Sequence, residues 1–245
     1  GLAIGIAVAG ASAGQLPILS GLGILIAFFG WRTSYQLLAI ILGLITLLVI
    51  ILLKPPIDRK DNVASTDYSG GDRLPERLQF LFSNKVFIPL FGAFTLCGFT
   101  TAGVIDVYFV PYAISSGYTL VEASTAYGIH GVGNLIGVIL FSWLADQVNR
   151  PRLLALMFFL RALTFILLIF ISTDLNLMFA FAVIFGVLNF ATFPVIANIV
   201  ATHIGVGIIG LTLGLLFGGH SLGAAVGAFI GGWIFDLTAQ HLWIW

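Results

Sequence analysis

The chain has 245 residues, of which 60% are hydrophobic and 8% charged, and its formal net charge is zero. A soluble domain carries about a quarter of charged residues, so this composition excludes a water-soluble globule and makes lipid the solvent for much of the surface. Zero net charge gives no electrostatic reason to expect a nucleic-acid partner. The single cysteine, Cys97, lies in an apolar stretch, cannot form a disulfide within the chain, and is expected to fill space.

Seven stretches are long and apolar enough to cross a bilayer, because a helix of about 20 residues spans the hydrocarbon core. They are apolar all round rather than alternating, which favours helices over a closed β-barrel. The predicted spans are 2–29, 35–53, 87–112, 123–145, 153–171, 177–200 and 207–235. We therefore expect an all-α integral membrane protein, a helical bundle with seven transmembrane helices.

The segment 54–85 interrupts this apolar pattern. Its prolines, glycines and mixed charges are typical of a solvated linker, and its end, around 73–82, could lie as a short interfacial helix. Basic loops mark the cytoplasmic side of a membrane protein. In the predicted topology one side holds Lys54, Arg59, Lys60, Arg73, Arg77, Lys85, Arg150 and Arg152, eight of the ten basic residues. We place residues 54–85 in the cytoplasm.

Glycines spaced by four residues form two ridges on the last predicted span. One ridge is Gly210, Gly214 and Gly218, and the other is Gly219, Gly223, Gly227 and Gly231. Small residues at this spacing let helices approach closely in lipid, and the ridges could serve tight packing, rocking of helices, or both. Two G-x-S-x-G matches, at 10–14 and 219–223, lie within predicted helices and lack the strand–turn–helix elbow of a hydrolase. We expect no enzyme.

Two ionisable residues fall inside predicted spans, where such residues are functional candidates. Asp106 lies in the outer part of its span, with Tyr108 two residues further on, and Arg161 lies midway along another span. The two could pair, or Asp106 could bind a proton or substrate. The alternatives are an Asp106 that is wetted near the interface and an Arg161 that anchors neighbouring helices through hydrogen bonds.

Neutral polar residues also gather inside the spans. Tyr127, His130 and Asn134 share one helical face. Further candidates for a substrate or coupling site lie centrally in other spans: Gln15, Asn189 and His220. Each alone could be an inter-helix hydrogen bond, but together they indicate a site near the bilayer midplane. Histidines that titrate near neutral pH would suit proton coupling, and no cluster of ligands predicts a metal site or a cofactor.

The turn at residues 142–153 places Asp146 just before Arg150 and Arg152. It resembles the G-x-L-A-D-R-x-G-R-R/K loop of the major facilitator superfamily at these three positions. The loop differs from that pattern at Ser142, Gln147 and Asn149. The resemblance implies a gating loop, in which Asp146 docks near residues 1–5, at a helix start whose dipole attracts a carboxylate, while Arg150 and Arg152 add polar contacts.

The resemblance extends over the whole chain. Gly30-Trp31-Arg32 is similar to the loop that joins helices five and six in this superfamily, and the charged linker resembles its central cytoplasmic loop. The chain would then be a fragment that covers helices five to eleven of twelve. Residues 1–53 would be the last two helices of the N-terminal bundle, 54–85 the central loop, and 86–245 a C-terminal bundle without its final helix.

Within the superfamily the chain resembles the monocarboxylate and oxalate/formate branch. The segments that carry this likeness are 3–14, Gly30-Trp31-Arg32, Cys97-Gly98 and 109–112. One departure concerns the Asp and Arg that monocarboxylate carriers have one turn apart in helix eight. At those positions this chain has Asn134 and Val138.

The resemblance implies a secondary transporter that moves a small solute by rocker-switch alternating access. The solute would be a monocarboxylate or another small organic anion, which Arg161 favours, and transport would be coupled to a proton or to an antiported solute. We expect a monomer, when full length, in the plasma membrane or the bacterial inner membrane. The alternatives are a seven-helix ligand receptor or sensor and a fragment with no activity alone. A retinal protein is excluded, because all three lysines lie in or beside the linker.

Overall fold

The computed structural model describes residues 2–52, 73–170 and 174–245, although the side chains of residues 2–17 and of several others before Phe29 are not described. The described residues are helical and include no strand. Six described segments could span a membrane: Phe29–Leu52, Phe87–Ser115, Leu120–Leu144, Arg150–Ile169, Leu175–His203 and Val206–Thr238. They confirm six of the seven predicted spans. The remaining one, 2–29, has a helical backbone, but most of its side chains lie outside the description.

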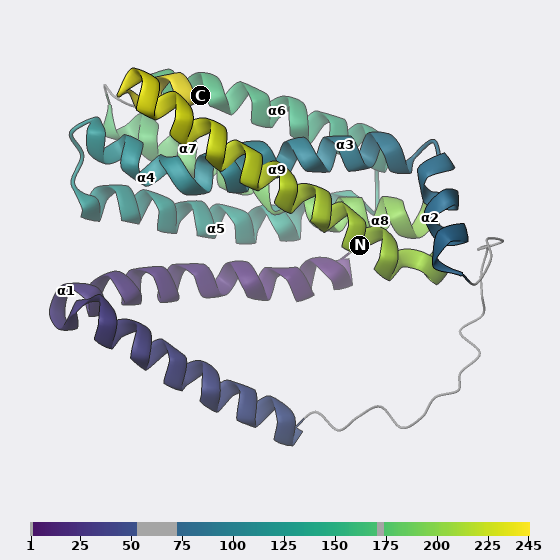
Figure 1. The fold of residues 1–245 in the computed structure, drawn as a ribbon, viewed down its shortest axis with the longest axis horizontal. Coiled ribbons are helices and arrows are strands. Elements are labelled where there is room, and N and C mark those ends of the chain that lie inside the picture. The colour runs from purple at the N-terminus through teal and green to yellow at the C-terminus, as the bar shows by residue number, and fades with distance from the viewer. Residues whose placement is uncertain (1, 53–72, 171–173) are drawn as a thin grey trace.

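The first helix, α1 (Leu2–Leu52), consists of two helices that meet at Gly30. The backbone of Gly30 has φ 75° and ψ 162°, a conformation that a residue with a Cβ rarely adopts. Figure 1 shows the two halves as a V, with the first half beside α5 (Leu120–Leu144) and the second leading away from the bundle. Glycine in the Gly30-Trp31-Arg32 turn is therefore required by the reversal of the chain.

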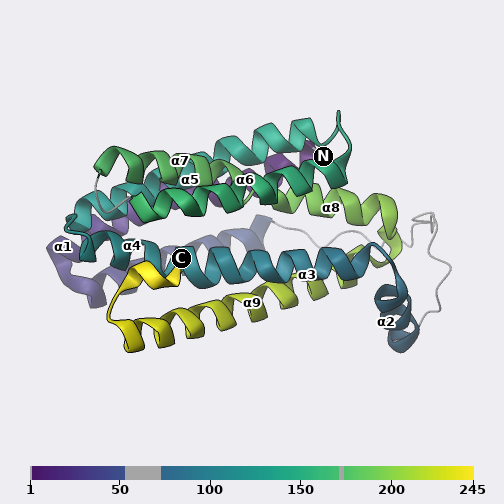
Figure 2. The same cartoon turned by 90° about the horizontal axis from the view of Figure 1, so that it is seen from above.

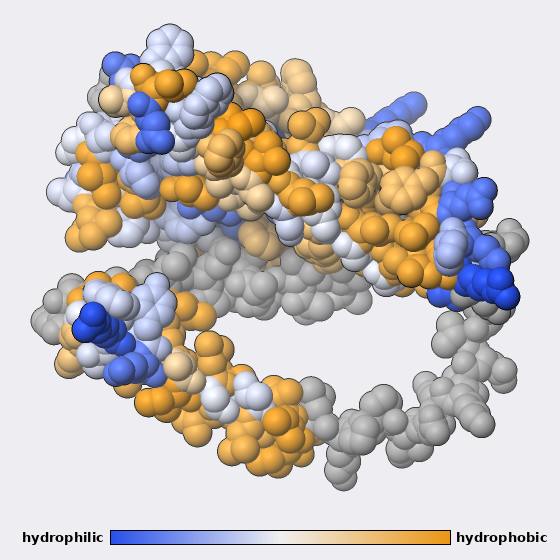
Figure 3. Space-filling model, in the orientation of Figure 1, coloured by the Kyte–Doolittle hydropathy of each residue, from blue (hydrophilic) through white to orange (hydrophobic). Residues whose placement is uncertain are grey.

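Polar residues precede helices α2 (Leu74–Ser83) and α5 and lie at the end of the bundle. Helix α2 buries Leu81 and exposes Leu74 and Phe82, and it corresponds to the short helix expected at the end of the linker. Helix α5 begins at a capping box, in which the backbone N–H of Glu122 donates to Thr119 Oγ1 at 3.2 Å. Figure 3 shows hydrophilic residues at the end of the bundle where α2 lies and hydrophobic residues over its middle, as expected for a surface in lipid.

The next span has three parts: α3 (Phe87–Gly98), the π-helical segment η1 (Phe99–Ile105) and α4 (Asp106–Ser115). Helix α6 (Arg150–Phe170) follows α5, and the span after it is divided into α7 (Leu175–Asn189) and α8 (Thr192–His203). The short helix η3 (Val206–Ile208) leads into α9 (Ile209–Thr238), and η4 (His241–Ile244) follows it. Figure 2 shows α9 lying along α3, and α5, α6 and α7 on the other side of the bundle.

Glycines bring two pairs of helices into backbone contact. On α9, the ridge of Gly219, Gly223, Gly227 and Gly231 is buried against α3, η1 and α4, whereas the ridge of Gly210, Gly214 and Gly218 faces open space. A Cβ on Gly223 would lie 2.0 Å from the carbonyl oxygen of Thr95. Between α5 and α7, a Cβ on Gly137 would lie 1.9 Å from the carbonyl oxygen of Val187. The close contacts of α9 with α3 and of α5 with α7 therefore depend on glycine.

Candidate polar site at the middle of the bundle

A layer of buried polar side chains separates two apolar clusters. On α5, Ala126 belongs to one cluster and Phe141 to the other, and on α6 the flanking members are Leu168 and Met157. The buried polar residues between these clusters are Thr101, His130, Asn134, Arg161, Thr164, Asn189 and Thr192. Burying so many polar groups halfway along the spans is costly without partners, and it is the arrangement expected of a site near the membrane midplane.

Asp106 is the acid at the edge of this layer. It begins α4 directly after the π-helical segment η1, a kind of helix distortion that often occurs at functional sites. Its side chain is exposed. Tyr127 of α5 and His220 of α9 lie close enough to act on its charge. Three helices thus meet around an accessible carboxylate.

His130 continues this group into the bundle. Its ring stacks between those of Tyr127 and Phe185, with centroid distances of 5.5 and 5.6 Å, and the residue is 4% exposed. Its Nε2 atom lies 3.3 Å from Nδ2 of Asn189 on α7. An amide nitrogen only donates, so His130 accepts through Nε2 and is neutral in this arrangement. Asp106, Tyr127, His130 and Asn189 therefore form a continuous chain of contacts.

Asn134 and Arg161 form hydrogen bonds with backbone groups at the C-terminal end of α7, next to this chain of contacts. Asn134 is wholly buried, and its Oδ1 accepts from the backbone N–H of Phe190 at 3.3 Å. Arg161 donates from Nη2 to the carbonyl oxygens of Leu188 and Asn189, at 2.6 and 2.9 Å, and from Nη1 to Cys97 Sγ at 2.8 Å. Among the described residues none of its hydrogen-bond partners is a carboxylate. The pair of Asp106 with Arg161 that the sequence allowed is not formed, and Arg161 instead anchors neighbouring helices.

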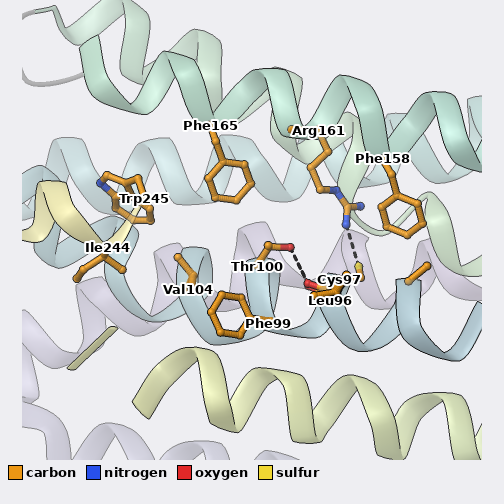
Figure 4. Close-up of a pocket in the computed structure, with 12 residues that line it drawn as sticks. Leu96, Cys97, Phe99, Thr100, Val104, Phe158, Arg161, Phe165, Ile244 and Trp245 are labelled. Atoms are coloured by element: carbon orange, nitrogen blue, oxygen red, sulfur yellow. Dashed lines mark hydrogen bonds between the residues drawn. The ribbon is translucent and has the colours of Figure 1, made fainter. Parts of the chain in front are cut away.

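A cavity of about 560 Å³ lies on the other side of Arg161 (Figure 4). Figure 4 shows Arg161, Cys97 and Phe158 at one end of it and Ile244 and Trp245 at the other. The walls come from α3, η1, α6 and η4 and are mainly apolar. Asp106, His130 and Asn189 do not line it. The cavity is therefore separate from the polar chain of contacts.

The remaining predicted site residues lie outside that chain or at its margin. The hydroxyl of Tyr108 donates to the carbonyl of Ala228, and its ring packs over Gly231, so it joins α4 to α9. The ring of His220 lies 4.7 Å from that of Phe94, and its side chain is also close to Cys97. The side chain of Gln15 lies outside the described residues. Cys97, expected only to fill space, thus contacts both Arg161 and His220.

The predicted gating loop is tied to α8. Oδ1 of Asp146 accepts from Nδ2 of Asn198 at 3.4 Å, and Arg150 donates through Nε to the carbonyl of Ala145 at the end of α5, at 3.1 Å. The backbone N–H of Arg152 donates to Asn149 Oδ1. The predicted docking of Asp146 near residues 1–5 concerns side chains outside the description. Sequence reasoning missed Asn198, whose only signal was an amide within an apolar half-helix.

Asn198→Ala is expected to loosen this loop. A hydrogen bond to a charged group contributes about 1.5–3 kcal/mol when well formed, and this one is long and partly exposed, so we expect a loss of about 1 kcal/mol. Labelling of an introduced Gln147→Cys by an impermeant maleimide should then become about fivefold faster. Thr202→Ala, which removes a hydroxyl whose hydrogen bonds among the described residues all lie within α8, is the control. Equal labelling rates in the two variants would contradict the prediction.

Comparisons with known proteins agree with this architecture. The sequence profile of the Major Facilitator Superfamily matches residues 1–205 and, in a second match, 107–245. The uncharacterized MFS-type transporter YcxA of Bacillus subtilis (strain 168) is 31% identical over 223 residues, which cover 88% of this chain and 52% of that protein. Monocarboxylate transporter 12 of Mus musculus is 30% identical over 139 residues, or 55% of this chain and 28% of that protein.

A third relative is similar over nearly the whole chain. Monocarboxylate transporter 11 of Homo sapiens is 26% identical over 259 aligned positions, which cover 98% of this chain and 51% of that protein. The chain thus spans about half the length of the Bacillus subtilis and human relatives.

Proposed function

The chain belongs to the Major Facilitator Superfamily, and we propose that it is part of a secondary transporter that carries a small organic anion together with a proton. Membership makes it a multi-pass membrane protein of a transport family. Monocarboxylates are the anions that we propose first, because two of the similar proteins carry the name monocarboxylate transporter. Alternating access of a site near the bilayer midplane is the mechanism that we propose for the movement.

The accessible carboxylate of Asp106 is the observation that carries this proposal. An ionised Asp106 repels an organic anion, whereas a protonated Asp106 can donate a hydrogen bond to it. Binding of the anion is then favoured by prior binding of a proton, which links the two in one transport step. Tyr127 and His220, beside Asp106, would supply further hydrogen bonds to the substrate or the acid.

Monocarboxylate carriers, which this chain resembles, have an acid at a different position, and we propose that Asp106 takes its role. The corresponding positions on α5 hold Asn134 and Val138, both wholly buried. Neither can bind a proton at neutral pH, and Arg161 gives its donors to the backbone of α7 and to Cys97. We therefore assign the proton to Asp106 and the binding of the anion to Tyr127 on α5 and His220 on α9.

Uptake by proteoliposomes tests the proposal. We would reconstitute the longest natural form of the protein and offer a panel of labelled short-chain carboxylates, with and without an inward proton gradient. The expected result is accumulation of at least one carboxylate that a protonophore abolishes. Uptake of no carboxylate, together with uptake of a cation or a sugar under the same conditions, would overturn the assignment. Residues 1–245 alone, tested in parallel, show whether this segment has activity by itself.

A further inference from the structure

The span made of α7 and α8 is interrupted at Phe190 and Ala191. Pro194, in the first turn of α8, has no N–H to donate to the carbonyl of Phe190. That carbonyl accepts instead from the N–H of Phe193, at 3.1 Å, in a tighter turn. The interruption leaves backbone groups of Leu188, Asn189 and Phe190 without their usual helical partners. In a membrane such groups must find partners within the protein.

Side chains from three helices supply those partners. Arg161 of α6 donates to the carbonyls of Leu188 and Asn189, at 2.6 and 2.9 Å. From α5, Asn134 accepts from the N–H of Phe190. The hydroxyl of Thr192, on α8 itself, donates to the carbonyl of Asn189 at 2.9 Å. Side-chain hydrogen bonds therefore satisfy the backbone groups that the interruption between α7 and α8 leaves unpaired.

The same junction also stabilises the positive charge of Arg161. Arg161 is 3% exposed, and its described hydrogen-bond partners include no acid. The C-terminal end of a helix carries a partial negative charge on its free carbonyls, and the guanidinium lies at that end of α7. The rings of Phe158 and Phe185 lie 5.5 and 5.8 Å from it. Arg161 thus fits the helix end as a forked donor, which lysine would match only in part.

The junction connects the polar layer to the part of α8 that contacts the Asp146 loop. On its outer side, Asn189 contacts His130. On its inner side, α8 carries Asn198, which donates to Asp146 of the predicted gating loop. A change in the angle between α7 and α8 would therefore move the loop relative to the polar layer.

We propose that Arg161 is a positioning residue for transport, which keeps the junction between α7 and α8 out of regular α-helical hydrogen bonding and thereby sets where α8 lies relative to the Asp146 loop. Without Arg161, the carbonyl of Asn189 keeps the Thr192 hydroxyl as a donor, whereas the carbonyl of Leu188 needs a new one. In a regular helix the N–H groups of Thr192 and Phe193 would serve these two carbonyls. These reach the carbonyls only if the junction closes into regular α-helix. Loss of Arg161 should therefore straighten the span. The link to transport rests on the proposed function, whereas the geometry of the junction does not.

A distance measured across the junction tests this inference. Spin labels on Asn176→Cys and Thr202→Cys, both exposed, report on α7 and α8, while the buried Cys97 is not labelled. An unbroken helix would place these backbone positions about 39 Å apart, since each residue adds about 1.5 Å. We expect a shorter distance in the native sequence and a shift toward the straight-helix value in Arg161→Met. Arg152→Met, an exposed arginine on the same helix, should cause no shift.

Two further variants cover the case in which Arg161→Met does not fold. Arg161→Lys should give an intermediate distance, because one ammonium cannot match the forked contact. Pro194→Ala restores an N–H without removing a polar side chain and should shift the distance in the same direction as Arg161→Met. Unchanged distances in these variants would overturn the inference, whatever the transport assay shows.

Transport kinetics separate positioning from substrate binding. If Arg161 sets the position of α8, Arg161→Lys should lower the maximal uptake rate about tenfold and leave KM nearly unchanged, whereas the loss of a substrate contact would raise KM. A raised KM with an unchanged distance would contradict the inference. If the native protein carries no carboxylate but the distances shift as expected, the proposed function fails and the role of Arg161 at the junction stands.

Discussion

Asp106→Asn is expected to remove the dependence of uptake on the proton gradient while it leaves exchange of the same substrate across the membrane intact. The amide cannot bind a proton at neutral pH, but its NH₂ group can still donate a hydrogen bond to an anion, as the protonated acid would. One proton moved with each anion sustains about a tenfold accumulation per pH unit. In Asp106→Asn this tenfold accumulation should fall to the level without a gradient, as measured by labelled carboxylate in proteoliposomes.

Asp174→Asn is the matched control for this substitution. Asp174 is an exposed acid that caps α7 by accepting from the N–H of Asn176 at 2.8 Å. Asparagine caps helices as well as aspartate does, so the control removes one carboxylate without loss of a helix end. Accumulation in Asp106→Asn that still follows the pH gradient would show that the proton binds elsewhere. Loss of both exchange and accumulation would assign Asp106 to substrate binding instead.

The architecture was predictable to the extent that lipid dictates it. In hydrocarbon, a single segment can pair its own backbone N–H and C=O groups only as a helix. Long apolar stretches therefore identify the six described spans directly. The ends were harder to predict, because helices continue into polar turns. Helix α5 starts at Leu120 and includes Glu122, since the capping box with Thr119 places that acid in the first turn. Hydropathy alone predicts that this span starts at residue 123.

The grouping of the candidate site residues is predictable where one helix determines it. Tyr127, His130 and Asn134 were placed on one face by helical spacing, and the structure points them at a common junction with Asp106 and α7. Contacts between helices that are far apart along the chain leave no such pattern in the sequence. Nothing in the sequence around Cys97 indicates its contact with Arg161, and nothing around Asn198 indicates its contact with Asp146. These depend on how the spans pack, which periodicity within one span does not encode.

Arg161 illustrates the difference. The sequence left open whether it pairs with Asp106, binds an anion or anchors helices. In the structure its guanidinium binds the carbonyls of Leu188 and Asn189, as expected of an anchor, and these carbonyls lack their usual helical partners because the span is interrupted there. Pro194 gave a hint of the interruption, but not of the arginine on another helix that stabilises it.

The two glycine ridges of α9 had the same spacing in the sequence, yet the structure gives them opposite environments. At Gly223 an added Cβ would lie 2.0 Å from the backbone oxygen of Thr95, so α9 and α3 would have to separate. At Gly214 an added Cβ meets nothing within 4 Å. Alanine also forms helix better than glycine by about 1 kcal/mol, and this gain is common to both positions. The difference between the two substitutions therefore isolates the packing contact.

Gly223→Ala is accordingly expected to destabilise the protein, and Gly214→Ala to leave it unchanged or slightly more stable. Overpacking of a tight contact costs about 1–3 kcal/mol, and a chain of this length loses about 2–4 °C in Tm for each kcal/mol. The Tm of Gly223→Ala in detergent should thus lie several degrees below that of Gly214→Ala. Equal Tm values would mean that α9 does not pack on α3 through this ridge. The reverse order would mean that the ridge of Gly210, Gly214 and Gly218 makes the closer contact.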